Sequence, residues 1–291
     1  MNYTNQVKKI AAVHDLSCVG RVSLKVVIPT LSSMGFEVCP LPTAVLSCHT
    51  QYPRFSFLDL TDEMPRIIDE WKQMKISFDA IYTGYLGSPR QLHIVSEFIN
   101  SFRTPQTLIV IDPVLGDNGH LYTNITEEMV DSMRELIPHA DVITPNLTEM
   151  FYLLGLPYNE KMDDDQLKDY LHRLSDKGPG IVIVTSVPVP DTERQTSVYA
   201  YNRTGNRYWK LTCPYLPAHY PGTGDTFTSV VTGALLQGDS LPIALDRATQ
   251  FILQGIRATF GYEYDNRDGI LLEKVLRNLD VPNYINTYEL I

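Results

Sequence analysis

Short apolar runs alternate with longer amphipathic stretches along most of the chain. Apolar runs of about four to eight residues are typical of buried strands, whereas apolar residues spaced three and four apart predict helices. "KIAAV" at 9–13 is the first such strand, and the helix that follows at 22–35 contains a proline and closes on a glycine. The same alternation predicts further strands at 36–46 (one or two), 78–82, 107–112, 140–144 and 180–186, and helices at 60–74, 88–102, 126–137, 146–155 and 163–178.

The pattern changes after residue 195. "TSVYAYN" (196–202) and "RYWKLT" (207–212) flank the turn "RTGN", and this predicts an antiparallel hairpin at the edge of the sheet. Three helical runs follow, at about 224–237, 241–260 and 269–278. Strands separated by helices form parallel sheets, so we expect an α/β fold with a mostly parallel central sheet, helices on both faces and an antiparallel edge hairpin. No linker or repeat interrupts the chain, which predicts a single domain over residues 1–291.

The composition narrows the class of protein. A hydrophobic fraction of 44% and a charged fraction of 20% are those of an ordinary globular protein. No run approaches the roughly 18 apolar residues of a membrane span, and the first ten residues lack the apolar core of a signal peptide, so we expect a cytoplasmic protein with no membrane partner. A net charge of −10 without any Lys/Arg block argues against nucleic acid. The four cysteines lack the paired spacing of a zinc or disulfide site, which indicates reduced thiols.

The stretch "YPGTGDTFTS" at 220–229 leads into an apolar run that predicts a buried helix. Asp225 suits the first turn of such a helix, because an acid there is stabilised by the free N–H groups and the helix dipole. One glycine would suffice for the turn, yet Gly222 and Gly224 flank Thr223. Two glycines leave a bare backbone concavity whose N–H groups can point at an anion. The sequence therefore predicts a phosphate-binding loop.

Polar side chains follow several predicted strands, where an open parallel sheet binds its ligands. These strand ends read His14-Asp15, "TGYLGS" (83–88), "DPVLGDNG" (112–119), "PNLTE" (145–149) and Ser186. Each has a purely structural alternative: Asn146 and Glu149, for example, fit a helix capping box, and His49 fits a buried structural histidine. Their concentration at one edge of one sheet favours a ligand site.

These motifs carry a resemblance to a known family. "GTGDTF" (222–227), "DPVLGDNG", "TPNLTE" (144–149), "TGYLGS" and "SCHTQY" (47–52) resemble the pyridoxal kinase branch of the ribokinase-like superfamily, over about residues 8 to 262. The resemblance implies ATP-dependent phosphorylation of the hydroxymethyl group of a vitamin B6 vitamer (pyridoxal, pyridoxine or pyridoxamine) to its 5'-phosphate. It also implies Mg²⁺, a monovalent cation such as K⁺ and a homodimer.

The resemblance assigns roles to particular residues of this chain. Asp225 is the implied base for the hydroxyl proton, with the N–H groups of Gly222, Thr223 and Gly224 stabilising the transferred charge. On the ATP side it implies Asp112, Asp117, Thr144, Asn146, Glu149, Thr185 and Ser186. Asp112 and Glu149 are also the implied metal residues, because oxygen ligands suit Mg²⁺. On the substrate side it implies Asp15, Val45, His49, Thr50, Tyr85 and Tyr122.

The chain departs from the family pattern at two positions. It reads "VHDL" where pyridoxal kinases read "IQSH", so Asp15 stands at a serine position, and Val45 stands where a glutamine is expected. A carboxylate only accepts hydrogen bonds, which predicts a preference for amine-bearing substrates such as pyridoxamine. Hydroxymethylpyrimidine (phosphate) kinases of thiamine synthesis also carry an aspartate there, and they are the alternative function. A catalytically silent binding regulator is a third possibility, although a retained Asp225 between glycines counts against it.

Overall fold

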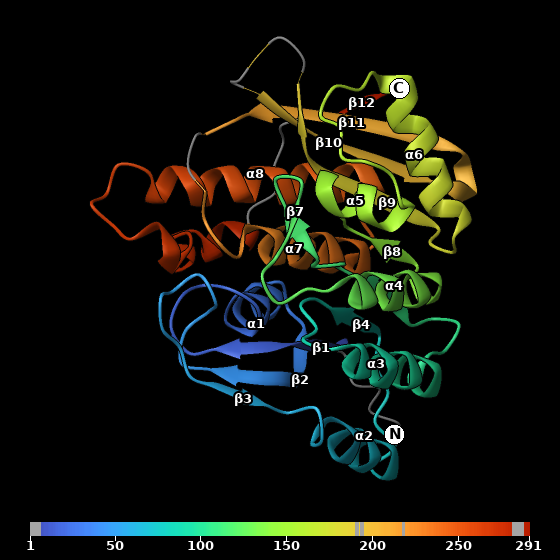
Figure 1. Cartoon of the computed structure of the whole chain (residues 1–291), viewed down its shortest axis with the longest axis vertical. Helices are drawn as coiled ribbons and strands as arrows, with labels where there is room; N and C mark the ends of the chain where they lie inside the picture. Colours follow the sequence, from blue (N-terminus) through green and yellow to red (C-terminus); the bar gives the residue numbers. More distant parts are fainter. Residues whose placement is uncertain (1–6, 190–191, 193–194, 217–218, 281–287) are drawn as a thin grey trace.

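The computed structural model describes residues 7–189, 192, 195–216, 219–280 and 288–291. Its main feature is a ten-stranded sheet in the order β12-β11-β10-β9-β8-β5-β4-β1-β2-β3 (Figure 1). Every neighbouring pair from β2 to β9 is parallel. These central strands are β1 Lys9–Ser17, β2 Glu37–Leu46, β4 Ala80–Thr83, β5 Leu108–Ile111, β8 Val142–Ile143 and β9 Ile181–Pro188. The predicted mostly parallel sheet is confirmed.

Antiparallel strands close both edges of the sheet. β3 (Phe57–Asp59) pairs with β2 at one edge. At the other edge β9 is followed by the hairpin of β10 (Gln195–Asn202) and β11 (Arg207–Pro214). The predicted antiparallel edge hairpin is confirmed, and β12 (Tyr288–Leu290) adds one further antiparallel strand outside β11. A three-residue, largely exposed strand has no periodicity that could have signalled it.

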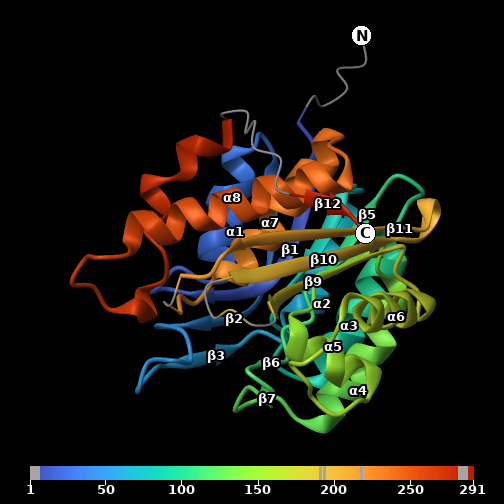
Figure 2. The ribbon, with the colours of Figure 1, turned by 90° about the horizontal axis from the view of Figure 1, so that it is seen from above.

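Helices cover both faces of the sheet, as predicted (Figure 2). Successive strand residues point to opposite faces, so Ala11 and Ile81 join one apolar core while Ile10 and Tyr82 join the other. The first core is covered by α2 Met64–Gln73, α3 Pro89–Phe102, α4 Glu127–Leu136, α5 Leu147–Leu154 and α6 Asp164–Asp176. The second core is covered by α1 Leu24–Ser33, α7 Thr223–Gln237 and α8 Leu241–Thr259. None of the helices that the structure describes is long and apolar enough to cross a membrane.

One local prediction was wrong, and one small element was missed. The expected helix at 269–278 is instead a pair of 3₁₀ segments, Leu272–Lys274 and Leu276–Asp280, after an earlier 3₁₀ turn at Asn266–Asp268. The buried residues there, Ile270, Leu272 and Val275, are spaced by two and three, which suits the tighter 3₁₀ turn better than an α-helix. A small hairpin of β6 (Gly116–Asp117) and β7 (His120–Leu121) was not foreseen either. Asp117 is the second residue of β6.

Candidate functional site

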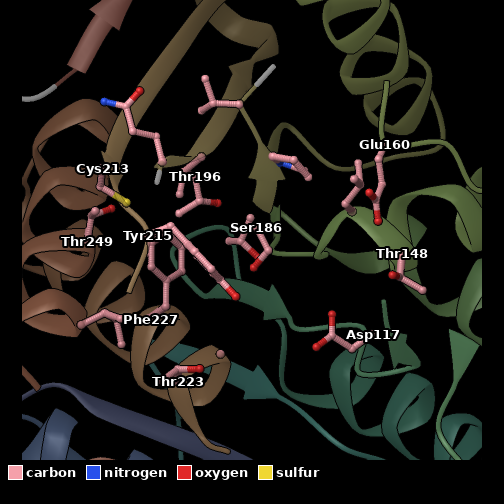
Figure 3. A pocket seen from close by; sticks show the side chains of 18 of the residues that line it. Asp117, Thr148, Glu160, Ser186, Thr196, Cys213, Tyr215, Thr223, Phe227 and Thr249 are labelled. Atoms are coloured by element: carbon pink, nitrogen blue, oxygen red, sulfur yellow. The ribbon is translucent and has the colours of Figure 1, made fainter. Parts of the chain in front are cut away.

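A cavity of about 1580 Å³ opens beyond the carboxyl ends of β8 and β9, next to the start of α7 (Figure 3). It brings together six residues that the sequence placed at the phosphates or the nucleotide: Asp117, Thr144, Thr185, Ser186, Thr223 and Gly224. The opposite wall is largely apolar and comes from the edge strands and α8, through Val198, Cys213, Pro214, Ile252, Leu253 and Ile256. A cavity with one polar and one apolar wall suits a ligand that carries a flat ring and an anionic tail.

The start of α7 explains both glycines of the loop. Gly222 is the N-cap residue with a φ of 80°, and a Cβ there would lie 2.0 Å from the carbonyl oxygen of Arg21. Only glycine fits this backbone and this contact. A Cβ on Gly224 would meet no heavy atom within 4 Å, and this residue lines the cavity. Gly222 is therefore required by packing, whereas Gly224 leaves space for a ligand.

Asp225 lies in the first turn of α7 and its side chain is 14% exposed. The backbone N–H of Ser23 donates to its Oδ2 over 2.8 Å, and Nδ1 of His14 lies 3.8 Å from its Oδ1. Burial raises the pKa of Asp225 to about 6, and the charge of Asp15 adds to this rise. His14 is fully buried and burial lowers its pKa to about 3, so the ring is neutral and gives Asp225 no positive partner. A carboxyl group that titrates near neutral pH is matched to general base catalysis.

Two further carboxylates lie nearby, on two different elements. Asp112 follows β5 and Glu149 lies in the first turn of α5; both are buried. Burial raises the pKa of Asp112 to about 8, helped by the negative charge of Asp225. Burial also raises the pKa of Glu149 well above its usual value, helped by the charge of Asp112. Asp112 therefore repels both Asp225 and Glu149 in a place where water screens charges little.

The capping box at the start of α5 is confirmed. Asn146 accepts from the Glu149 N–H over 2.9 Å, and the Asn146 N–H donates to Glu149 Oε2 over 2.7 Å. The second Glu149 oxygen, Oε1, accepts from the N–H of Leu115 over 3.1 Å. The amide of Asn146 also donates to the carbonyl of Gly116 over 2.7 Å. Glu149 thus links the loop after β5 to the start of α5 through hydrogen bonds. This structural role does not depend on a metal.

The acidic residues fit a magnesium ion that is held largely by its substrate. Within the described part of the chain no group of three or more His, Cys, Asp or Glu side chains is placed to hold a metal by itself. Mg²⁺ is commonly bound by only one or two carboxylates together with phosphate oxygens. The raised pKa values of Asp112 and Glu149 indicate uncompensated negative charge that such a cation would relieve.

The remaining nucleotide-side predictions lie together on the cavity wall. Thr144 is buried and its hydroxyl accepts from Thr228 over 2.9 Å. Thr185 lies within β9 and forms a parallel bridge with Asn146. The next residue, Ser186, has a φ of 58°, in the left-handed region. Asp117 accepts from the N–H of Asn118 over 2.9 Å and faces the cavity (Figure 3). The structure brings these residues to one cavity, and the nucleotide-binding roles that the resemblance implies remain predictions.

The substrate-side predictions fall into two groups, of which the first lies near the acidic cluster. Asp15 is buried on β1, and Val45 lies on β2 opposite Leu16. The pKa of Tyr85 is raised by burial and by the charge of Asp15. Burial and the charges of Glu149 and Asp117 raise the pKa of the Tyr122 phenol.

The second group lies on the loop after β2. Nε2 of His49 lies 2.6 Å from the carbonyl oxygen of Arg267, and its ring meets Tyr52 edge-on. These contacts hold that loop against the segment after α8. Thr50, its neighbour, is exposed. The structural alternative for His49 is therefore present, and neither residue is brought to Asp225 by a contact in the described structure.

Sequence reasoning missed Ser23, which contacts Asp225 from 202 positions earlier in the chain. "VSLK" reads as an ordinary helix start, and nothing in it signals the backbone geometry described below. Tyr82 was also missed as a neighbour of the site; its hydroxyl donates to the carbonyl of Asp225 over 3.3 Å. The Ser23 contact arises because α1 and α7 pack side by side, and the Tyr82 contact arises because α7 covers the face of the sheet on which the Tyr82 side chain lies.

Comparison with known proteins places the chain in a family. A family model described as phosphomethylpyrimidine kinase matches residues 58–268. The chain is 30% identical over 258 residues to the pyridoxine/pyridoxal/pyridoxamine kinase of Bordetella avium, across 86% of this chain and 85% of that one. The chain belongs to the pyridoxal kinase branch of the ribokinase-like superfamily. The family that the motifs resembled is thus confirmed.

Solved structures of family members share the fold over nearly their full length. A candidate phosphomethylpyrimidine kinase from Bacteroides thetaiotaomicron is 75% identical with a TM-score of 0.97, covering 100% of both chains. A second crystal form of that protein contains pyridoxal; it is 76% identical, with a TM-score of 0.96 over 98% of this chain and 100% of that one. Pyridoxal kinase from Lactobacillus plantarum is 32% identical, with a TM-score of 0.86 over 94% and 97% of the two chains.

The two loop glycines should respond differently to alanine. Gly222→Ala meets the Arg21 carbonyl and a positive φ, so we expect the protein to lose at least about 1–3 kcal/mol of unfolding free energy. Gly224→Ala meets nothing and improves helix propensity, so its stability should be equal or higher. Its methyl group enters the cavity, however, and should raise the KM for the nucleotide. Urea unfolding of both variants checks the first expectation, and equal stability losses would contradict it.

Proposed function

We propose that this protein transfers the γ-phosphoryl group of ATP to the hydroxymethyl group of a vitamin B6 vitamer. The observation that carries the proposal is Asp225: a partly exposed carboxyl with a pKa of about 6 at the start of α7, beside the cavity and near Asp15. Curated pyridoxal kinases among the relatives support it, and so does the pyridoxal bound by the Bacteroides protein.

Each step can be assigned to a group of this chain. The vitamer hydroxyl oxygen attacks the γ-phosphorus while the bond to the ADP oxygen breaks, and Asp225 takes the hydroxyl proton. The N–H groups at the start of α7 face the charge on the transferred phosphoryl, with the helix dipole behind them. Asp112 and Glu149 would hold Mg²⁺, which when bound neutralises phosphate charge. The apolar cavity wall would hold the adenine ring.

The finer expectations belong to the same proposal. A monovalent cation beside Asp117, a homodimer, a cytoplasmic location and a single domain over 1–291 are implied by the resemblance and by the uninterrupted sequence pattern. The net charge of −10 makes charge neutralisation at the phosphates more important here, because the protein's overall field repels ATP.

Phosphorylation of hydroxymethylpyrimidine is the second candidate. It is favoured by the name of the matching family model and by an aspartate at position 15. A panel of the three B6 vitamers and hydroxymethylpyrimidine, ranked by kcat/KM with MgATP, separates the two candidates. We expect a vitamer to rank first; hydroxymethylpyrimidine in first place would overturn the proposal. Tight vitamer binding without turnover of any compound would identify a regulator instead.

The base can be tested by pH and by substitution. Asp225 accepts a proton only when it is deprotonated, so kcat/KM should fall as the pH drops through about 6. Asp225→Asn should lower kcat by roughly 10²–10⁴ while ATP binding changes little. Asp69→Asn on the exposed side of α2 is the matched control, because it removes an equal charge far from the cavity. An Asp225→Asn enzyme that keeps most of its kcat would refute the role.

The metal role of Glu149 is separable from its capping role. Glu149→Gln should raise both the Mg²⁺ concentration for half-maximal rate and the KM for ATP, because it removes one charge from the acidic cluster. The variant should also lose about 1–3 kcal/mol of stability, since an amide cannot accept from both backbone N–H groups. Glu128→Gln, an exposed acid in the first turn of α4, is the control. An unchanged Mg²⁺ dependence would mean that Glu149 only caps α5.

A further inference from the structure

Ser23 has a backbone conformation that serine rarely adopts. Its φ is 50° and its ψ is −134°, in a region populated almost only by glycine. It is the N-cap residue of α1, yet its side chain makes no capping hydrogen bond. Strain of this kind persists only where the surroundings hold the residue in place.

Two hydrogen bonds hold Ser23 in this conformation and show what the conformation achieves. The hydroxyl of Ser23 donates to Asp15 Oδ1 over 2.5 Å, and both residues are only 5% exposed. The backbone N–H of Ser23 donates to Asp225 Oδ2 over 2.8 Å. An unstrained serine that capped α1 in the usual way would use its side-chain oxygen on that helix instead. The strained conformation thus links one buried carboxylate to the proposed base.

The neighbouring backbone restricts Ser23 further. The Arg21 carbonyl and the Val22 Cα both lie against Gly222, close enough that a Cβ there would be 2.0 Å and 3.1 Å from them. Residues 21–23 are therefore pressed onto the first turn of α7, which packs beside α1 (Figure 2). Asp15 is also fixed, because its Oδ2 accepts from the Ser17 hydroxyl over 2.8 Å.

We propose that Ser23 is a positioning residue for Asp225, and that Asp15 serves chiefly to hold Ser23 in its strained conformation. With Oδ2 of Asp225 held by the Ser23 N–H, Oδ1 remains for the hydroxyl proton of the substrate. This inference rests on the proposed function. It assigns Asp15 a different role from the contact with a substrate amine that the sequence suggested.

The test compares alanine and glycine at one position. Ser23→Ala removes the hydrogen bond to Asp15, while the alanine Cβ still disfavours the positive φ. The backbone should therefore shift to another conformation and release Asp225. We expect kcat to fall about ten-fold or more, with the KM values for ATP and vitamer nearly unchanged. Ser23→Gly also removes the hydroxyl, but glycine adopts this φ without strain and should recover most of the lost kcat. Ser17→Ala removes the other hydroxyl on Asp15 and should lower kcat much less than Ser23→Ala.

A second variant tests the role of Asp15. Asp15→Ser should lower kcat for pyridoxal and pyridoxamine by similar factors, because the defect lies at the base rather than in vitamer recognition. A shift of about ten-fold toward pyridoxal, with kcat retained, would overturn the inference and restore the substrate-contact role. Equal losses in Ser23→Ala and Ser23→Gly, or no loss in either, would overturn it as well.

Melting temperatures test the backbone strain at Ser23 without any need for catalytic turnover. Ser23→Gly should melt above Ser23→Ala, because only alanine retains the strain. At Ser240, the N-cap of α8 with an ordinary φ of −67° and no side-chain cap, glycine should give no such advantage. If wild-type protein phosphorylates no compound of the panel, the proposed function fails, while the melting order still decides whether Ser23 is held under strain. The same order at both serines would contradict the inference.

Discussion

The site depends on one close backbone contact, that of the Arg21 carbonyl with Gly222. Because Gly222 has no side chain, the segment before α1 can lie directly on the first turn of α7. That contact sets the position of the start of α7 relative to β1. It thereby also sets the positions of Asp225 and of the free N–H groups beside the cavity. Any larger residue at 222 would push the two segments apart and separate the base from its Ser23 donor.

Electrostatics at the sheet edge form a second constraint. Asp112, Glu149 and Asp225 come from three different elements, and burial raises the pKa of each. The charge of Asp225 adds to the rise at Asp112, that of Asp112 to the rise at Glu149, and that of Asp15 to the rise at Asp225. Such a cluster lowers the stability of the folded protein when its members are ionised, and a bound cation restores that stability. The backbone N–H groups that bind Glu149 hold it in place meanwhile. The arrangement is organised for a bound cation rather than for stability alone.

The surroundings of Asp15 decide what a carboxylate does at this position. A carboxylate at a serine position suggested a different substrate. In the structure its two oxygens already accept from Ser17 and Ser23, so a change at one position is coupled to the backbone at another. The buried imidazole of His14 beside Asp225 is neutral. A charged imidazole there would keep Asp225 deprotonated but would make it a weaker base.

The sequence alone determined the features that depend on local patterns. Apolar periodicity predicted the strands and most helices, "NLTE" predicted the capping box, and the glycines of "GTGD" with the strand-end motifs predicted the site and the family. Tertiary structure decided what depends on distant contacts. β12 became an edge strand and residues 272–280 became 3₁₀ turns through packing that local propensity does not encode. The strained Ser23 joins Asp15 to Asp225 only because α1 and α7 pack together, and no residue pattern within "VSLK" specifies that contact.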